Sequence, residues 1–95
     1  MKNVELSLGS GEAYNFCEAG KTIRWYRRSF NMSQQELAKR LGTSSPLIAG
    51  WERGIGGMTV KSLVKLARIF GVSETELLHP SEEVKRWINM SEKKP

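Results

Sequence analysis

Hydrophobic residues recur at helical spacing along most of this chain, and short polar runs separate them. The clearest stripes lie between residues 32 and 54, in two sets: Leu37, Ala38 and Leu41, then Leu47, Ile48 and Trp51. Apolar positions three or four residues apart share one face of an α-helix. This stretch therefore predicts two short helices, each with one buried face.

The residues around these stripes predict where both helices begin and end. Ser33 and Glu36 have the spacing of a capping box, in which the serine hydroxyl accepts from a backbone N–H of the first turn. Gly42 follows the first helix, where a left-handed residue is needed and glycine adopts that conformation at low cost. Thr43–Ser45 offers caps for the second helix, and Pro46 suits its first turn because proline lacks the N–H. Two helices of about eight residues joined by such a turn form a helix-turn-helix.

The same spacing predicts helices on both sides of this motif. One spans Lys21–Phe30, where Ile23, Tyr26, Arg27 and Phe30 share a stripe and Arg24 and Arg28 point to another side. A helix at 60–70 has a broad apolar face that begins with Val60, and a short one follows at 73–78. A last helix begins at Ser81 and carries Val84, Trp87 and Ile88 on one face. The fold class is therefore all-α.

The first twenty residues leave alternatives open. Residues 1–11 fit either a disordered arm or a short strand that pairs with its own copy in a dimer. Residues 12–20 fit either a short helix or an extension of the next one, and Gly20 weakens the case for continuity. We divide the chain into an N-terminal arm (1–19), a helix-turn-helix domain (20–79) and a C-terminal amphipathic helix with its tail (80–95).

Composition narrows the classes of function. The chain has 95 residues, enough for one domain with a small core. Its single cysteine, Cys17, cannot form an intramolecular disulfide, and no Cys/His cluster has the spacing of a metal site. No apolar run approaches the roughly 18 residues of a membrane span. We expect a cytoplasmic protein with no membrane contact and no metal or other cofactor.

The net charge of +5 is concentrated in one part of the chain. Residues 21–60 contain seven basic and two acidic residues, whereas residues 1–20 are acidic overall. The positive potential therefore lies on the helix-turn-helix and on the helix before it. This distribution suits a polyanionic partner, although a solvated basic face on a small soluble domain would look the same.

The sequence MSQQELAKRLGTSSPLIAGWERG, followed by TVKSLVKLARIFGVSETELL, resembles the Cro/CI-type helix-turn-helix family, also called lambda-repressor-like or XRE. The similar signs are the Gln-x-Glu-Leu-Ala opening, the turn glycine, the isoleucine in the second helix and Glu-Arg-Gly at its end. The resemblance covers Gly20–Leu78. It implies a compact five-helix lambda-repressor-like DNA-binding domain, to which this chain appends a C-terminal helix.

In that family the second helix of the motif lies in the major groove of double-stranded DNA, and helix N-termini point at phosphates. The resemblance implies contacts with the DNA backbone for Gln34, Ser44, Arg53 and Lys61, and a groove face made of Ser45, Pro46, Ala49 and Gly50. It also implies that Arg27 in the first helix pairs with Glu52 at the end of the second helix. We interpret that pair as structural, because their neighbours are apolar and an unpaired charge there would be costly.

The groove face departs from the usual pattern of the family. The family usually has Gln, Arg, Asn or Lys at these positions, and this helix has neither a guanidinium nor an amide for two-pronged base contacts. The small residues suit close approach, contacts with thymine methyl groups and selection by DNA shape. They are equally compatible with a domain that no longer binds DNA specifically.

We predict a sequence-specific transcriptional regulator, a phage-like or bacterial repressor that binds a near-palindromic operator as a homodimer. The helix after Pro80, with Trp87 and Ile88, would form part of the dimer interface; the alternative is packing against its own domain near Trp25. Other interpretations are an antitoxin or protein-interaction module whose flanking segments bind a protein, and a low-specificity nucleoid protein. No nucleophile, phosphate-loop or zinc motif indicates an enzyme.

Overall fold

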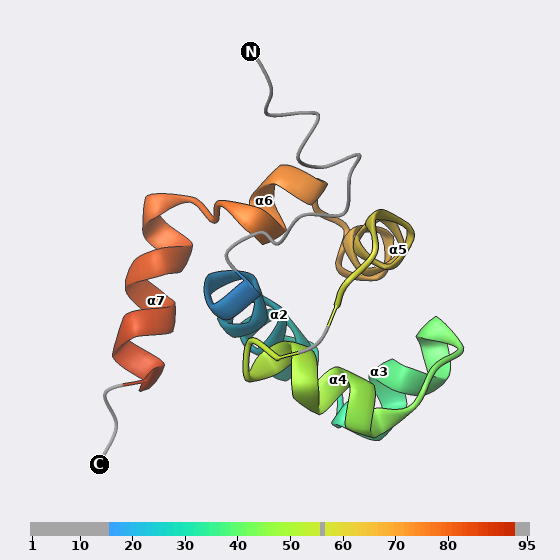
Figure 1. Ribbon diagram of the computed structural model, residues 1–95. Helices are drawn as coiled ribbons and strands as arrows, with labels where there is room; N and C mark the ends of the chain where they lie inside the picture. Colours follow the sequence, from blue (N-terminus) through green and yellow to red (C-terminus); the bar gives the residue numbers. More distant parts are fainter. Residues whose placement is uncertain (1–15, 56, 93–95) are drawn as a thin grey trace.

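A computed structural model describes residues 16–55 and 57–92 of the chain. Within these ranges it contains helices and no strands: α2 (Phe16–Ser29), α3 (Gln34–Leu41), α4 (Ser45–Glu52), α5 (Val60–Phe70), α6 (Glu74–Leu78) and α7 (Glu82–Glu92). Helix α2 runs through the middle of the molecule, with α3 and α4 together at one side and α7 at the other (Figure 1). The all-α fold class expected from the sequence is confirmed.

Local capping sets both ends of α3 as predicted, and α4 begins after one of the predicted cap residues. The Ser33 hydroxyl accepts from the backbone N–H of Glu36 at 3.0 Å, and Gly42 ends α3 with a left-handed φ of 76°. Ser44 is the N-cap residue of α4, and Pro46 lies in the first turn of that helix. Only the residues between Leu41 and Ser45 separate the two helices, so the chain turns sharply and α3 packs against α4.

Helix α2 is longer than predicted, because it begins at Phe16 and continues through Gly20 instead of starting at Lys21. A side chain at Gly20 would collide with the backbone carbonyl oxygen of Trp51 and would lie 3.0 Å from that of Glu52. Glycine in this helix is therefore explained by the close approach of α4. The described residues do not include residues 1–11, for which the sequence allows either a disordered arm or a short strand that pairs with its own copy in a dimer.

The core brings together one face of each helix from α2 to α6. Its buried members are Ile23, Met32, Leu37, Ala38, Leu41, Ile48, Trp51, Met58, Leu63, Leu66, Ala67, Phe70 and Leu77. Three expected core residues are largely exposed instead: Phe30 at 48%, Leu47 at 38% and Val60 at 51%. On α4 the buried stripe is Ile48, Trp51 and Glu52, so Leu47 turns about 100° away from it.

Helix α7 packs against α2 of the same chain. Val84 and Ile88 are buried, and the indole of Trp87 stacks on that of Trp25 with centroids 5.4 Å apart and an interplanar angle of 16°. This arrangement is the alternative in which the last helix packs against its own domain near Trp25. Ile88 is already covered within the chain and is not available for a dimer contact. The outer face of α7 remains exposed at Trp87 and Met90.

Candidate nucleic-acid interface

The N-termini of α3 and α4 supply groups that suit phosphate binding. Gln34 is the first residue of α3 and is partly buried, whereas Ser44 precedes α4 and is exposed. The Ser44 hydroxyl makes no capping hydrogen bond to its helix. Free backbone N–H groups at a helix N-terminus, together with the helix dipole, attract anions. The two ends therefore have the chemistry that the sequence interpretation requires.

The surface of α4 is small and mostly apolar. Pro46 and Leu47 are exposed, and Ser45 and Ala49 are half-buried. Leu47 was predicted to lie in the core; in the structure it joins the accessible face of α4. Ser45 is the residue on this face with a hydrogen-bonding side chain, so the helix has little capacity for polar base recognition.

Gly50 is constrained by its own chain. The Ile55 backbone N–H donates to the Gly50 carbonyl oxygen at 2.7 Å, and a Cβ atom at Gly50 would lie 3.3 Å from the Ile55 carbonyl oxygen. The loop after α4 therefore folds back over this position. A large side chain at Gly50 would disturb that loop as well as any DNA contact, which makes Gly50 a poor site for testing the groove face.

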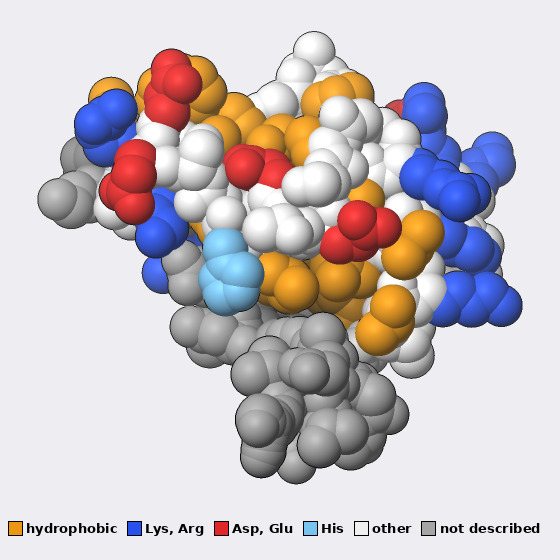
Figure 2. All heavy atoms as spheres, turned by 90° about the horizontal axis from the view of Figure 1, so that it is seen from above, with side chains coloured by type: hydrophobic (Ala, Val, Ile, Leu, Met, Phe, Trp, Pro, Cys, Tyr) orange, Lys and Arg blue, Asp and Glu red, His pale blue; other side chains and the backbone are white. Residues whose placement is uncertain are grey.

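Exposed basic side chains lie beside the motif. Arg53 follows α4 and Lys61 lies in the first turn of α5, and both are exposed. Further exposed cations on α3 and α5 are Lys39, Arg40, Lys65 and Arg68. Figure 2 shows Lys and Arg side chains gathered along the edge of the molecule where α3 and α5 lie. A surface of this kind complements a polyanion.

A buried ion pair joins α2 to the end of α4. Glu52 is 3% exposed and Arg27 is 8% exposed. Arg27 Nε donates to Glu52 Oε2 at 2.6 Å, and Arg27 Nη2 donates to Oε1 at 3.0 Å. The remaining Nη1 donates to the Met32 carbonyl oxygen at 2.8 Å. This two-pronged arrangement satisfies both charged groups in the interior and fixes the position of α4 relative to α2.

Two further residues converge on the same carboxylate. Gln34 Nε2 donates to Glu52 Oε1 at 3.0 Å, and Arg24 Nε lies 3.5 Å from that oxygen. Burial alone would raise the pKa of Glu52, but the hydrogen bonds from Arg27 and Gln34 and the charges of Arg27 and Arg24 outweigh burial and lower that pKa. Glu52 is therefore a carboxylate at neutral pH, and it orients the Gln34 side chain at the start of α3.

The sequence interpretation missed the role of Arg24, which it placed on another side of the helix. Its spacing of three residues from Arg27 was the available signal, because residues three apart lie on neighbouring parts of a helix surface. Among the described residues, no group of three or more His, Cys, Asp or Glu side chains could hold a metal ion. No helix in the described part is long and apolar enough to cross a membrane.

Comparison with known proteins agrees with this geometry. A family model described as helix-turn-helix matches residues 23–77. The chain belongs to this helix-turn-helix family. This chain is 36% identical over 64 residues to the uncharacterised HTH-type transcriptional regulator y4dJ of Sinorhizobium fredii. The alignment covers 67% of this chain and 83% of the relative.

Solved structures show the same helical arrangement. The restriction-modification controller protein C.AhdI from Aeromonas hydrophila matches with a TM-score of 0.61 and 27% identity, over 65% of this chain and 94% of that one. The hypothetical transcription factor NHTF from Neisseria matches with a TM-score of 0.67 and 25% identity, over 77% and 84%. The family resemblance is confirmed: this helix-turn-helix protein is a DNA-binding transcriptional regulator.

Proposed function

We propose that this regulator is a bacterial or phage-like repressor that binds a near-palindromic operator as a homodimer, with α4 in the major groove. The observation that carries the proposal is the accessible face of α4, which is small and apolar and lies among cations and helix N-termini. Such a helix can approach base edges closely while the surrounding groups bind phosphates. Selection of bound duplexes from a random pool tests the proposal. An enriched two-fold symmetric site is expected; an unenriched pool would refute specific recognition.

Phosphate contacts by Arg53 and Lys61 predict a measurable salt dependence. Each phosphate that a protein neutralises contributes a slope of about −0.9 to log K against log salt concentration. Arg53→Gln and Lys61→Gln should each make this slope shallower by about one, and each should weaken binding to all duplexes by the same factor. Arg86→Gln, which removes an exposed charge from α7, is the matched control. Slopes that are equal in all three variants would remove both residues from the proposed interface.

The apolar face of α4 predicts recognition of thymine through its methyl group. Leu47 is 38% exposed beside Pro46, and an apolar side chain in the major groove contacts the thymine C5-methyl. Replacing thymine by deoxyuracil at positions of the selected site should weaken binding by the parent protein by about 0.8 kcal/mol, the value of one buried methyl-sized group. Leu47→Ala should bind both duplexes with nearly equal affinity. Ser45→Ala should keep the preference for thymine, and its loss in that variant would assign the contact to Ser45.

The proposed dimer uses the exposed outer face of α7. Trp87 is 43% exposed and Met90 is 65% exposed, and they lie three residues apart on one face. Sedimentation equilibrium of Met90→Glu should show a weaker dimer, because a carboxylate would be buried in an apolar contact. Asn89→Glu places the same charge on an exposed neighbouring position and serves as the control. Equal dimerisation by both variants would exclude this face.

A further inference from the structure

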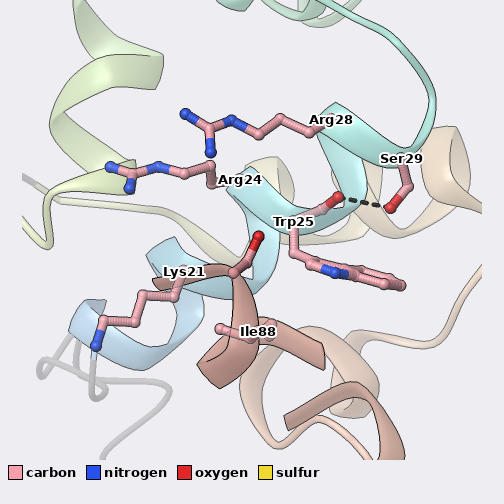
Figure 3. A pocket seen from close by; sticks show the side chains of 7 residues that line it. Lys21, Arg24, Trp25, Arg28, Ser29 and Ile88 are labelled. Carbon is pink, nitrogen blue, oxygen red and sulfur yellow. Dashed lines mark hydrogen bonds between the residues drawn. The ribbon is translucent and has the colours of Figure 1, made fainter. Parts of the chain in front are cut away.

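A cavity lies between α2 and α7, apart from the groove face of α4. It has a volume of about 210 Å³, and the described residues that line it are Lys21, Arg24, Trp25, Arg28, Ser29, Ile88 and Ser91. Trp25 and Ile88 form an apolar wall, and Arg24 and Arg28 extend side by side from α2 in a different direction (Figure 3). Small-ligand sites combine an apolar wall with a small number of polar groups.

The charge of the lining is strongly unbalanced. Three of the described lining residues are cationic and none is acidic. Lys21, Arg24 and Arg28 are spaced by three and four residues, so they follow one another along one side of α2. Like charges at these spacings repel one another in a helix. An anion between them would remove that repulsion and gain charge-assisted hydrogen bonds.

Two of the three cations, Lys21 and Arg28, are exposed side chains that suit ligand binding. Arg24 Nε lies 3.5 Å from Glu52 Oε1, and this ion pair holds the Arg24 guanidinium at the edge of the cavity. Within the described ranges, Lys21 and Arg28 have no ion pair. Both are exposed, so they can close on an anion that enters from solvent. A lysine ammonium and an arginine guanidinium together are typical of phosphate recognition.

We propose that this cavity binds a small anion that carries a phosphate group, with the organic part of the ligand against Trp25 and Ile88. The volume is below the roughly 300–1,000 Å³ of drug-sized ligand sites, which limits the ligand to a compact molecule. One wall belongs to α7 through Ile88 and Ser91. Binding would therefore tie α7 more firmly to α2, and the ligand would act as an effector that stabilises this contact.

Titration of the full chain, free of DNA, with phenyl phosphate, inorganic phosphate and phenol tests the proposal. The indole N–H signal of Trp25 in ¹H–¹⁵N NMR spectra reports binding at the site. Phenyl phosphate should bind more tightly than inorganic phosphate, and phenol should not bind, because both the charge and the ring contribute. Absence of a saturable shift with phenyl phosphate would overturn the proposal.

Matched variants separate a defined site from general attraction to a basic protein. The double variant Lys21→Gln with Arg28→Gln should bind phenyl phosphate about tenfold more weakly, equivalent to about 1.4 kcal/mol of binding free energy. Lys85→Gln with Arg86→Gln removes the same charges from α7, outside both the cavity lining and the basic surface beside the motif, and should change affinity less than twofold. Equal weakening by the two pairs would overturn the proposal. So would a pattern in which the Lys21/Arg28 pair changes only the salt dependence of DNA binding, since that would assign the cations to the DNA backbone.

Discussion

Replacing Gly20 by alanine adds one methyl group at the contact between α2 and α4. In an isolated helix this change would be favourable by about 0.8–1.0 kcal/mol, because alanine has a much higher helix propensity than glycine. In this protein the new Cβ atom would collide with the Trp51 carbonyl oxygen and lie 3.0 Å from that of Glu52. Both obstacles are backbone atoms, which cannot rotate away as a flexible side chain can.

The two effects have opposite signs, and the collision is the larger. Extra atoms in a well-packed interior cost about 1–3 kcal/mol, and a collision with rigid backbone atoms belongs to the upper part of this range, about 2–3 kcal/mol. Subtracting the propensity gain of about 0.8–1.0 kcal/mol leaves a destabilisation of about 1–2 kcal/mol for Gly20→Ala. At about 4–8 °C per kcal/mol for a small domain, the Tm should fall by about 4–16 °C. The separation of α2 from α4 also moves Glu52 relative to Arg27, so the loss is not confined to one contact.

Thermal unfolding followed by circular dichroism measures this effect. Gly57→Ala is the control, because a Cβ atom at Gly57 would meet nothing within 4 Å. That variant should be as stable as the parent or slightly more stable, since alanine restricts the unfolded chain. A Gly20→Ala protein that melts at or above the parent would refute the argument, and would mean that α2 and α4 are farther apart than the structure places them.

Four further outcomes are expected. Arg27→Ala should lower the stability by about 3–5 kcal/mol, because it leaves Glu52 buried without its main partner; DNA affinity per folded molecule should change less, as a binding titration corrected for the folded fraction would show. Because folding lowers the pKa of Glu52, its ionised carboxylate stabilises the folded state at pH values above its ordinary pKa of about 4.3. This stabilisation is lost as the pH falls from about 4.3 through the folded-state pKa. The Tm of the parent should therefore fall more steeply over this pH range than the Tm of Glu52→Gln. The Tyr26 hydroxyl donates to Glu76 Oε2 at 3.0 Å. Burial, and secondly this carboxylate, raise the pKa of Tyr26 to about 12. The stability of the parent should therefore fall as the pH rises from about 10 towards 12, and Tyr26→Phe should not show this loss. Tyr26→Phe should also cost about 1 kcal/mol at neutral pH, measured by urea unfolding, because the hydrogen bond is removed.

The sequence was sufficient for the helix-turn-helix and for the capped ends of α3, α5 and α6, but not for the start of α2. The hydroxyls of Ser33, Thr59 and Ser73 each accept from the backbone N–H three residues later, as their spacing indicates. Gly42 and Gly71 both adopt the left-handed conformation that ends a helix. These features depend on atoms within four residues of one another, so a local pattern is enough to predict them.

Contacts between helices were less predictable. The predicted buried faces of α4 and α5 each include one residue that is exposed, because a sequence shows hydrophobicity but not how much surface the neighbouring helices cover. Leu47 and Val60 therefore lie outside the core. For Leu47 this error concerns function, since an apolar residue on the accessible face of α4 changes the expected base recognition.

The family, the order of the helices and the basic character of residues 21–60 could all be predicted from the sequence. These follow from short-range periodicity, from capping and from counting charges, none of which needs the chain to be folded. Only the packed structure explains why Gly20 lies inside a helix and shows that Arg24 joins Arg27 at Glu52. It also shows that α7 covers α2 through Trp25, Trp87 and Ile88. Each of these depends on the distance between segments far apart in sequence, and the relative placement of packed helices sets that distance.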